Sequence, residues 1–377
     1  MKASIIVTTY KQSAILKYIL ISLLNQQTEY DYEIIVCDDG SIDDSYEIIR
    51  DLRSNKKNIE ISYCWQQDRG FRAASARNMG ISRANGDVII LLDGDMIPRP
   101  DLVQKHLDQH IRHSKILLTG SRLSVDDSDF FNCLKEGMSF LDILSCIDKV
   151  SFLNSEELQY RQIWYHGEKP WMSVFSCNLS FPRSEHSKYS ELFVGWGIED
   201  WDLSKRLYEE GYEIKFDESI IAYHIDYKPV ISNAFRNNNH NQMVEFARNL
   251  LLFIDQYPKE DLSECAIALK SYEITNNRFV WGGDGRYIRD EKESINLIRN
   301  WLRNNNIYSK SQDFYIQKPY KSRKEIKVVD SEAIELLKKA DTKYDQINLV
   351  LENLDPAEIA KILGHANLIQ SEIKAYL

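Results

Sequence analysis

Short apolar runs alternate with amphipathic segments along the first 226 residues of the chain. The run Ser4–Thr9 is continuous and β-rich, whereas the apolar residues of Ala14–Leu24 recur at helical spacing. The same pattern predicts strands over residues 33–37, 59–65, 88–92, 115–119, 172–181 and 220–225, and helices over 46–52, 73–84, 101–113 and 203–211. Continuous apolar strands between helices are typical of a mostly parallel central sheet covered on both faces. Residues 1–226 are therefore predicted to form one α/β domain.

The pattern changes after residue 226. Residues 227–330 are predicted to be a helical or irregular extension, in which Gln242–Tyr257 is a helix. Residues 331–377 read as short amphipathic helices with apolar stripes, one of them formed by Ile347, Val350 and Leu351. Such stripes usually pack on a core, and binding at a membrane surface is the alternative. Residues 121–170 are polar and are predicted to be irregular.

Composition narrows the functional classes. The chain has 377 residues, enough for about two domains, and a formal net charge of -10. A nucleic-acid binder would normally carry a basic patch, so nucleic acid is not an expected partner. Apolar runs fall short of the roughly 20 residues that a membrane span needs, so we expect a cytoplasmic protein, with peripheral membrane association as the variant. The scattered cysteines are expected to be reduced core thiols: Cys37, Cys64, Cys133, Cys146, Cys177 and Cys265.

Carboxylates follow two of the predicted strands. Asp38 and Asp39 come after the second apolar run, and Asp93 and Asp95 flank a glycine after the fourth. Ligands of such sheets bind outside the carboxyl ends of the strands, and carboxylate oxygens suit Mg²⁺ or Mn²⁺ that meets a diphosphate. The alternative is a turn that favours Asp and Gly for conformational reasons. His224, on the last strand, is the candidate further ligand, although a lone histidine there is more often a core residue.

A second acidic cluster lies in Gly195–Asp202, which combines three carboxylates with two glycines and two tryptophans. Close-approach backbone, a flat apolar face such as that of Trp196, and acid/base groups are what a sugar-handling site needs. Asp200 is the candidate base. Glu199 and Asp202 also fit the first turn of a helix, where the helix dipole favours acids.

Two further segments carry candidate ligand contacts. Gly70–Asn78 begins a helix and contains Arg72 and Arg77, whose guanidinium groups could reach a diphosphate. The alternative is a pair of solvated arginines. The aromatic stretch Tyr160–Trp171 is a candidate lid, because tryptophan and tyrosine faces stack on sugars. Core aromatics are the alternative there.

Four motifs in this order resemble a GT-A glycosyltransferase of family 2. They are Val-Cys-Asp-Asp-Gly-Ser at 36–41, Gly-Phe-Arg-x-x-x-Ala-Arg-Asn at 70–78, Leu-Asp-Gly-Asp at 92–95 and Gly-Trp-Gly-x-Glu-Asp-x-Asp at 195–202. The last motif is similar to the catalytic segment of β-1,4-galactosyltransferases and of bacterial chondroitin-polymerase-type enzymes. The resemblance covers residues 1 to 226 and implies the GT-A fold, a Rossmann-like, mostly parallel sheet flanked by helices, followed here by a helical appendage.

The resemblance also implies roles for individual residues. A UDP-sugar would be the donor, and a saccharide, a lipid-linked compound or a small molecule would be the acceptor. The implied roles are Asp38 and Asp39 on the uracil and ribose, Asp93 near the ribose or donor sugar, Arg72 on the diphosphate, Asp95 and His224 on Mn²⁺ or Mg²⁺, Asp200 as the base, and Glu199 as a sugar-binding acid. Trp196 belongs to the donor site. Trp201 replaces an acid of the galactosyltransferases, which leaves the choice of donor open.

The expected activity is a metal-dependent, inverting glycosyl transfer in which Asp200 deprotonates the acceptor hydroxyl. A retaining transferase is the nearest alternative, although its mechanism gives no obvious role to a base at this position. A dehydrogenase or methyltransferase is disfavoured, because the turn Thr8–Gln12 lacks the glycine-rich fingerprint of dinucleotide binding. A nucleotide-sugar-binding module without transfer activity is the third alternative.

Overall fold

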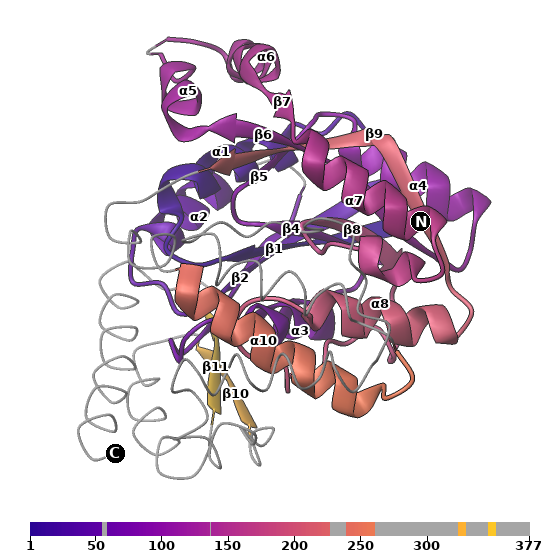
Figure 1. Cartoon of the computed structure of the whole chain (residues 1–377). Coiled ribbons are helices and arrows are strands. Elements are labelled where there is room, and N and C mark those ends of the chain that lie inside the picture. Colours follow the sequence, from indigo (N-terminus) through magenta and orange to yellow (C-terminus); the bar gives the residue numbers. More distant parts are fainter. Residues whose placement is uncertain (55–58, 136, 227–238, 261–322, 329–345, 352–377) are drawn as a thin grey trace. The chain divides into compact units, whose positions relative to one another are not determined.

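The chain divides into two compact units. A computed structural model describes residues 1–54, 59–135, 137–226, 239–260, 323–328 and 346–351. Unit 1 comprises residues 1–189, 203–227 and 320–377, and unit 2 comprises residues 190–202 and 228–319. The predicted limit at residue 226 lies next to the junction between residues 227 and 228, whereas residues 190–202 group with the later part of the chain. The described strands belong to unit 1 (Figure 1).

One mixed sheet forms the centre of unit 1. Its strands are β1 (Lys2–Thr9), β2 (Asp31–Asp38), β3 (Ile61–Gln66), β4 (Val88–Asp93), β5 (Met96–Pro98), β6 (Ile116–Asp126), β7 (Phe152–Leu153), β8 (Asn178–Pro182), β9 (Glu213–Asp226), β10 (Arg323–Val328) and β11 (Gln346–Leu351). The helices of unit 1 are α1 (Ser13–Leu24), α2 (Ser45–Ser54), α3 (Ala73–Arg83), α4 (Leu102–Arg112), α5 (Asp127–Asn132), α6 (Phe140–Val150), α7 (Ser155–His166) and the 3₁₀ helix η1 (Pro170–Ser173). Helix α8 (Glu199–Glu209) begins in unit 2 and continues in unit 1, and α10 (Asn239–Gln256) belongs to unit 2.

The first four predicted strands form a parallel block in the order β3-β2-β1-β4. Ile5 and Val7 of β1 share a buried cluster with Leu16 of α1. The intervening Ile6 faces α3, where a Cβ at Gly80 would lie 2.6 Å from its side chain. Figure 1 shows α1 and α3 on opposite sides of these strands. The predicted α/β sheet with helices on both faces is thus confirmed.

The later strands make the sheet mixed. Strand β8 pairs antiparallel with both β4 and β6, and β6 pairs parallel with β9 through a bulge between Gly120 and Ser121. The sequence predicts only residues 220–225 of β9, because the first half of Glu213–Asp226 is charged and only partly buried. Strand β5 is three residues long, too short for a periodic pattern to reveal it.

The prediction of irregular structure over residues 121–170 is wrong. This stretch contains the end of β6, three helices and the short β7. A capping signal is present in it: the Ser139 hydroxyl donates to the Asp142 carboxylate (2.6 Å) and accepts from the Asp142 N–H (3.2 Å). Ser139 is thus the N-cap residue of α6, and a serine at this position is a common signal of a helix start. Helix α5 has only six residues, too few for a periodic pattern, whereas α6 carries apolar residues at helical spacing (Phe140, Ile143, Leu144 and Ile147), so a helical signal is present there.

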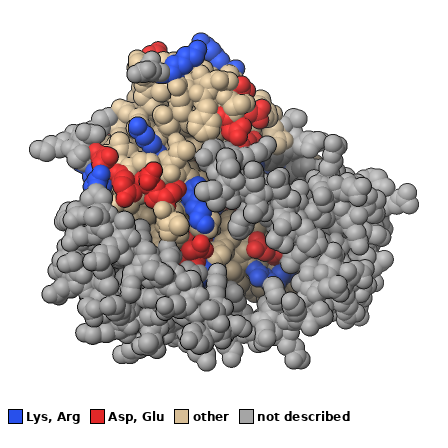
Figure 2. Space-filling model, turned by 90° about the vertical axis from the view of Figure 1, so that its left-hand side faces the viewer, with Lys and Arg blue, Asp and Glu red and all other residues tan. Residues whose placement is uncertain are grey.

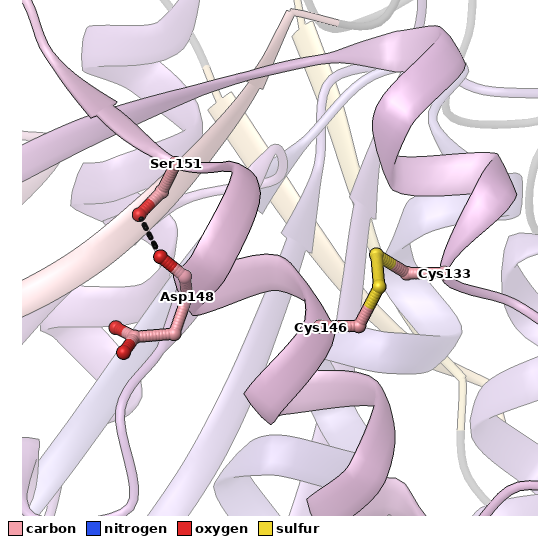
Figure 3. Close-up of a disulfide and its surroundings, with 4 residues drawn as sticks. All are labelled: Cys133, Cys146, Asp148 and Ser151. Atoms are coloured by element: carbon pink, nitrogen blue, oxygen red, sulfur yellow. Dashed lines mark hydrogen bonds between the residues drawn. A yellow bond between two sulfur atoms is a disulfide. The ribbon is translucent and has the colours of Figure 1, made fainter.

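A disulfide joins Cys133, just after α5, to Cys146 of α6, with Cα atoms 5.6 Å apart (Figure 3). The expectation of six reduced thiols is therefore wrong for this pair. The spacing of 13 residues matches no metal motif, and the pairing arises because two helices joined by a short connection bring the two positions together. Cys37, Cys64 and Cys177 are buried thiols, and Cys265 lies outside the described residues.

The prediction of short helices in the tail is wrong for residues 346–351. They form β11, which pairs antiparallel with β3 and parallel with β10. Residues 347–351 form a short apolar run interrupted only by Asn348, and such a short β-rich run also suits a strand. The other predicted tail helices, over residues 331–345 and 352–377, lie outside the described part of the chain.

Charged side chains of both signs occur in small groups on the face drawn in Figure 2. Within the described residues, the helices lack the combination of length and apolarity required for a bilayer span.

Helix α4 and β8 are connected by a buried chain of hydrogen bonds. His106 Nε2 donates to Asn178 Oδ1 (3.0 Å), so His106 Nδ1 accepts from Ser180 Oγ (2.8 Å), which in turn accepts from His110 Nε2 (2.8 Å). The Asn178 amide then donates to the carbonyls of Ser121 and Ile220 (3.0 Å each), so the chain links α4 with three strands. Both imidazoles are neutral in this arrangement, because burial lowers the pKa of His106 to about 4 and that of His110 to about 3.

These histidines should make the fold sensitive to acid. The unfolded chain protonates a histidine below about pH 6.5, whereas the folded chain keeps both rings neutral to lower pH. The two neutral histidines therefore contribute their full share to the free energy of unfolding above about pH 6.5. This contribution is lost as the pH falls toward about 4. We expect His110→Gln, which keeps a donor for Ser180 but does not titrate, to reduce the loss in unfolding free energy between about pH 7 and 4.5 by about 1–3 kcal/mol.

Urea unfolding at a series of pH values measures this difference. His186→Gln is the control, because His186 is 71% exposed and should leave the pH profile unchanged. Superimposable profiles for wild type and His110→Gln would contradict the prediction.

Candidate active site

The hydrogen-bond register of the parallel block brings three strand ends to one edge of the sheet. Thr9, the last residue of β1, pairs with Asp38 of β2, and Thr8 pairs with Asp93 of β4. The predicted carboxylates of unit 1 therefore gather around the end of β1. Crevices at the carboxyl ends of parallel strands are where α/β proteins bind ligands.

Asp38 is fully buried, and its carboxylate is occupied by the protein itself. One oxygen accepts from the Ser41 N–H (2.7 Å) and the other from the Tyr63 hydroxyl (2.8 Å). Burial raises the pKa of Asp38 to about 7, although these hydrogen bonds favour the ionised form. The structure therefore gives Asp38 a role in shaping the turn after β2.

Asp39 and Arg72 form a buried pair. The Asp39 carboxylate accepts from the Arg72 N–H (2.6 Å) and from Gln66 Nε2 (2.5 Å), and it lies 3.5 Å from the Arg72 guanidinium. Burial raises the pKa of Asp39 to about 6, while the guanidinium acts in the opposite direction. Arg72 is only 2% exposed and also donates to the Gln67 carbonyl. Its guanidinium is thus directed at Asp39, and a role on a diphosphate stays a prediction.

The neighbouring Arg77 of α3 forms an ion pair with Asp93, with 3.0 Å between Nη2 and Oδ1. Its guanidinium also lies 5.3 Å from the centre of the Tyr189 ring. The adjacent Asn78 binds the Tyr189 backbone twice, donating to the carbonyl (2.9 Å) and accepting from the N–H (2.7 Å). Arg77 therefore links the turn after β4 to the last residue of unit 1 before residues 190–202.

Asp95 and His224 are neighbours, as predicted for a shared site. His224 of β9 pairs with Met96 of β5, which puts its Nε2 3.6 Å from Asp95 Oδ2. Its Nδ1 lies 3.4 Å from Asp226, an arrangement that can orient the ring. Gln12 donates to Asp95 Oδ2 (3.2 Å). Both Asp95 and His224 are partly exposed, with side-chain exposures of 16% and 15%.

The pair fits a divalent metal in its donor types. A carboxylate oxygen and an imidazole nitrogen suit Mn²⁺, and the carboxylate alone suits Mg²⁺. The described residues contain no cluster of three or more His, Cys, Asp and Glu side chains arranged to hold a metal ion. Any metal at Asp95 and His224 would therefore take its remaining ligands from water or from a bound phosphate group, which is how Mg²⁺ is usually held.

The turn after β1 contributes residues that the sequence argument used only to exclude a dinucleotide fold. The Tyr10 hydroxyl donates to Asp68 (3.0 Å), and Lys11, with φ of 53°, donates its N–H to the Ser41 hydroxyl (2.7 Å). Gln12 from the same turn reaches Asp95. Their position in the sequence could have revealed them. A turn that follows a parallel strand lies at the same edge of the sheet as the acids that follow the neighbouring strands.

The remaining candidates lie in unit 2, in residues Gly195–Asp202, here called the acidic turn. Glu199 and Asp200 are the first two residues of α8, with Glu199 buried and Asp200 half-buried. Gly195, Gly197 and Ile198 have φ of 85°, 87° and 77°. A left-handed β-branched residue such as Ile198 is a backbone outlier, of a kind that costs about 1–3 kcal/mol and often marks a functional site.

Asp202 lies in the first turn of α8, the position that the alternative interpretation gave it, and its carboxylate also binds two side chains near the end of α10. It is fully buried and accepts from the Tyr257 hydroxyl (3.0 Å) and from Gln256 Nε2 (3.2 Å). Trp196 is half-buried, and its ring centre lies 5.8 Å from that of Phe246 in α10. Asp200 is thus the most exposed of the three acids in the acidic turn.

The aromatic stretch Tyr160–Trp171 divides between the two interpretations. Trp171 is 2% exposed; its carbonyl accepts from the Ser204 hydroxyl (2.8 Å), and Lys205 lies over its ring. It therefore acts as a core aromatic. Trp164 and Tyr165 of α7 are half-buried, and a role for them over a ligand stays a prediction.

Comparison with known proteins gives two family matches. Residues 4–179 match the glycosyl transferase family 2, and residues 164–228 match the N-terminal domain of galactosyltransferase. Together they include the strand-end carboxylates, the acidic turn and His224. The glycosyltransferase GlyG of Streptococcus pneumoniae is 31% identical over 274 residues, which cover 72% of this chain and 81% of that protein.

Two longer relatives match part of the chain. The hyaluronan synthase of Pasteurella multocida is 32% identical over 239 residues, and the chondroitin synthase of Escherichia coli is 30% identical over 237. Each match covers 59% of this chain. The chain covers only 24% of the length of the first relative and 34% of the second.

The glycine between Asp93 and Asp95 should be essential to their arrangement. A Cβ at Gly94 would lie 2.6 Å from the Gln12 side chain, 2.8 Å from the Thr8 carbonyl and 2.9 Å from Thr9 Cα. Because two of these atoms are backbone, the turn would have to move. We expect Gly94→Ala to lower the free energy of unfolding by about 1–3 kcal/mol, measured by urea denaturation.

Gly137→Ala is the comparison variant, in which the backbone conformation alone opposes the new side chain. Gly137 has φ of +81°, but a Cβ added there would have no atom within 4 Å, so we expect a loss of about 1 kcal/mol at this position. A Gly94→Ala variant as stable as wild type would show that the turn does not depend on close approach.

Proposed function

The chain belongs to glycosyl transferase family 2, and from this premise we propose that it transfers a sugar from a UDP-sugar to a hydroxyl of a saccharide acceptor, with inversion. The chain is a glycosyltransferase; the donor, the stereochemistry and the residue roles are the proposal. The observation that carries it is the alignment of strand ends, which gathers Asp38, Asp39 and Asp93 beside the Asp95–His224 pair.

The donor side of the proposal rests on unit 1. Asp39 and the turn after β1 would bind the uridine, with Arg72 and Asp38 keeping the surrounding backbone in shape through their buried contacts. Asp93, which is partly exposed while paired with Arg77, would accept from a hydroxyl of the ribose or donor sugar. Asp95 and His224 would hold a divalent ion, which would stabilise the negative charge that develops on the leaving diphosphate.

The acceptor side rests on the acidic turn. Asp200 would take the proton from the acceptor hydroxyl as that oxygen attacks the anomeric carbon from the face opposite the UDP. Glu199 would bind the acceptor or donor sugar, and Trp196 would offer its ring to a sugar face. Partial exposure of Asp200, next to the buried Asp202, supports the choice of base. We propose residues 1–226 as the catalytic domain.

The names of two relatives support a saccharide acceptor. Hyaluronan and chondroitin synthases build polysaccharides by name, and the chain matches about a quarter to a third of each. We therefore propose a role in polysaccharide synthesis, limited to the addition of a sugar by this one catalytic domain. Short hyaluronan and chondroitin oligosaccharides are the first acceptors to test.

Donor and metal are tested together by UDP release from a panel of UDP-sugars, with and without Mn²⁺ or Mg²⁺. We expect turnover of one donor that requires the ion, and a loss of about 100-fold or more in Asp95→Ala, because the carboxylate would be a direct metal ligand. The control is Asp51→Asn on the exposed side of α2, which should match wild type. Metal-independent turnover by wild type would contradict the metal site, and no turnover of any UDP-sugar would contradict the choice of donor.

The base is tested by comparing two rates in Asp200→Asn. Transfer to an oligosaccharide acceptor should fall by about 100-fold or more, because the acceptor hydroxyl loses its proton acceptor. Slow donor hydrolysis should persist, because the donor and metal residues are unchanged. Product analysis by NMR would give the anomeric configuration. Wild-type transfer by Asp200→Asn, or retention of configuration, would contradict the proposed mechanism.

A further inference from the structure

Helix α10 makes specific contacts with the acidic turn, although it lies beyond residue 228, where the matched family regions end. Both elements belong to unit 2. One face of α10 presents Glu245, Phe246, Asn249 and Phe253, which recur at helical spacing and so lie along one stripe. The family resemblance gives no role to this stripe.

Two polar side chains of α10 bind the backbone of the acidic turn. Glu245 accepts from the Trp196 N–H (2.9 Å), and Asn249 donates through Nδ2 to the Gly197 carbonyl (2.8 Å). The Arg248 guanidinium donates to Asn249 Oδ1 (3.2 Å), which fixes the amide with its nitrogen toward Gly197. These bonds hold the two backbone groups that precede the left-handed Ile198.

Helix α10 also packs closely against the two glycines of the acidic turn. A Cβ at Gly195 would lie 2.7 Å from the Glu245 carboxyl carbon, and one at Gly197 would lie 2.8 Å from the Phe246 ring. Both glycines are left-handed, and so is the buried Ile198 that follows them. A backbone in sparsely populated conformations persists when its surroundings hold it there, and α10 supplies those surroundings.

The residues that follow Asp200 are also held by α10 and by the residue after it. The Phe246 ring centre lies 6.2 Å from that of Trp201, and Phe253 lies 6.5 Å from the same indole. Tyr257, directly after α10, donates to Asp202 (3.0 Å). The residues before and after Asp200 are therefore fixed to one helix, whereas Asp200 itself is half-buried and keeps a surface for a ligand.

We propose that Glu245 and Asn249 are positioning residues, which hold the acidic turn in the strained conformation that orients the Asp200 carboxylate for proton abstraction. The inference rests on the proposed function, in which Asp200 is the base. The two residues bind backbone and would touch no substrate. Because the residues proposed to bind the uridine and the metal belong to unit 1, loss of Glu245 or Asn249 should change the rate of transfer more than the affinity for the donor.

The test uses variants of the full chain that differ in one hydrogen bond. Asn249→Asp keeps the shape of the side chain but removes the donor to Gly197. Glu245→Leu removes the acceptor for Trp196, whereas Glu245→Gln keeps an acceptor oxygen and is the conservative replacement. Asp255→Asn is the control on the same helix, because Asp255 is exposed. Asp200→Asn is the reference for loss of the base.

Three quantities are measured for each variant: kcat and donor KM for transfer to the oligosaccharide acceptor, the rate of donor hydrolysis, and amide hydrogen exchange of peptides that cover residues 195–202. We expect Asn249→Asp and Glu245→Leu to lower kcat by about 10- to 100-fold, since small misplacements of a catalytic group have effects of this size. Donor KM and hydrolysis should stay within about twofold, and exchange should rise in the acidic turn. Glu245→Gln should recover most of the rate.

The outcomes separate the inference from the function on which it rests. If Asp200→Asn loses transfer but Asn249→Asp and Glu245→Leu keep the wild-type kcat, the positioning role is overturned and the base assignment stands. A fall in kcat accompanied by an equal fall in hydrolysis and a lower melting temperature also overturns it, because that pattern indicates general destabilisation. Wild-type transfer by Asp200→Asn overturns the base assignment and the inference together.

Discussion

The register between three parallel strands is the constraint on which the donor side of this protein depends. Thr9 pairs with Asp38 and Thr8 with Asp93, so strands of similar length end at one edge. A slip of one residue would exchange the side chains that β1 directs toward α1 with those that it directs toward α3, and the close packing of both buried faces opposes this exchange. Core packing, which fixes the strand register, therefore also fixes the positions of these carboxylates.

Burial then divides the acids into two groups. Asp38, Asp39 and Asp202 are almost fully buried, and each accepts hydrogen bonds from neighbouring groups. Asp93, Asp95 and Asp200 keep part of their surface. A buried carboxylate needs internal partners to offset its lost hydration, and the three buried acids have such partners. Within the acidic turn the sequence shows equivalent carboxylates, and only the fold distinguishes the half-buried Asp200 from the buried Asp202.

Much of the parallel block could be predicted from the sequence, because buried parallel strands are continuous apolar runs with a simple pattern. The six-residue α5 could not, since it is too short for a periodic pattern, whereas α6 has an N-cap serine and helical apolar spacing, which do indicate a helix. Among the site residues, the pairing of Asp95 with His224 was predicted from their ligand types, from their positions on strands and from the resemblance. The burial of Arg72 against Asp39, and the contacts of Asn249 with the acidic turn, depend on side-chain directions and on a helix far along the chain, which no local pattern contains.

The Cys133–Cys146 disulfide also bears on how samples of this protein compare with one another. The bond closes a segment that connects β6 to β7, whereas Cys37, Cys64 and Cys177 are thiols inside unit 1. Protein produced in a reducing cytosol and protein produced in an oxidising compartment would thus have the same sequence and sheet but differ in mass by two hydrogen atoms. Two laboratories could then study chemically distinct forms of α5 and α6 under one name. An intact mass recorded without reductant identifies which form a preparation contains.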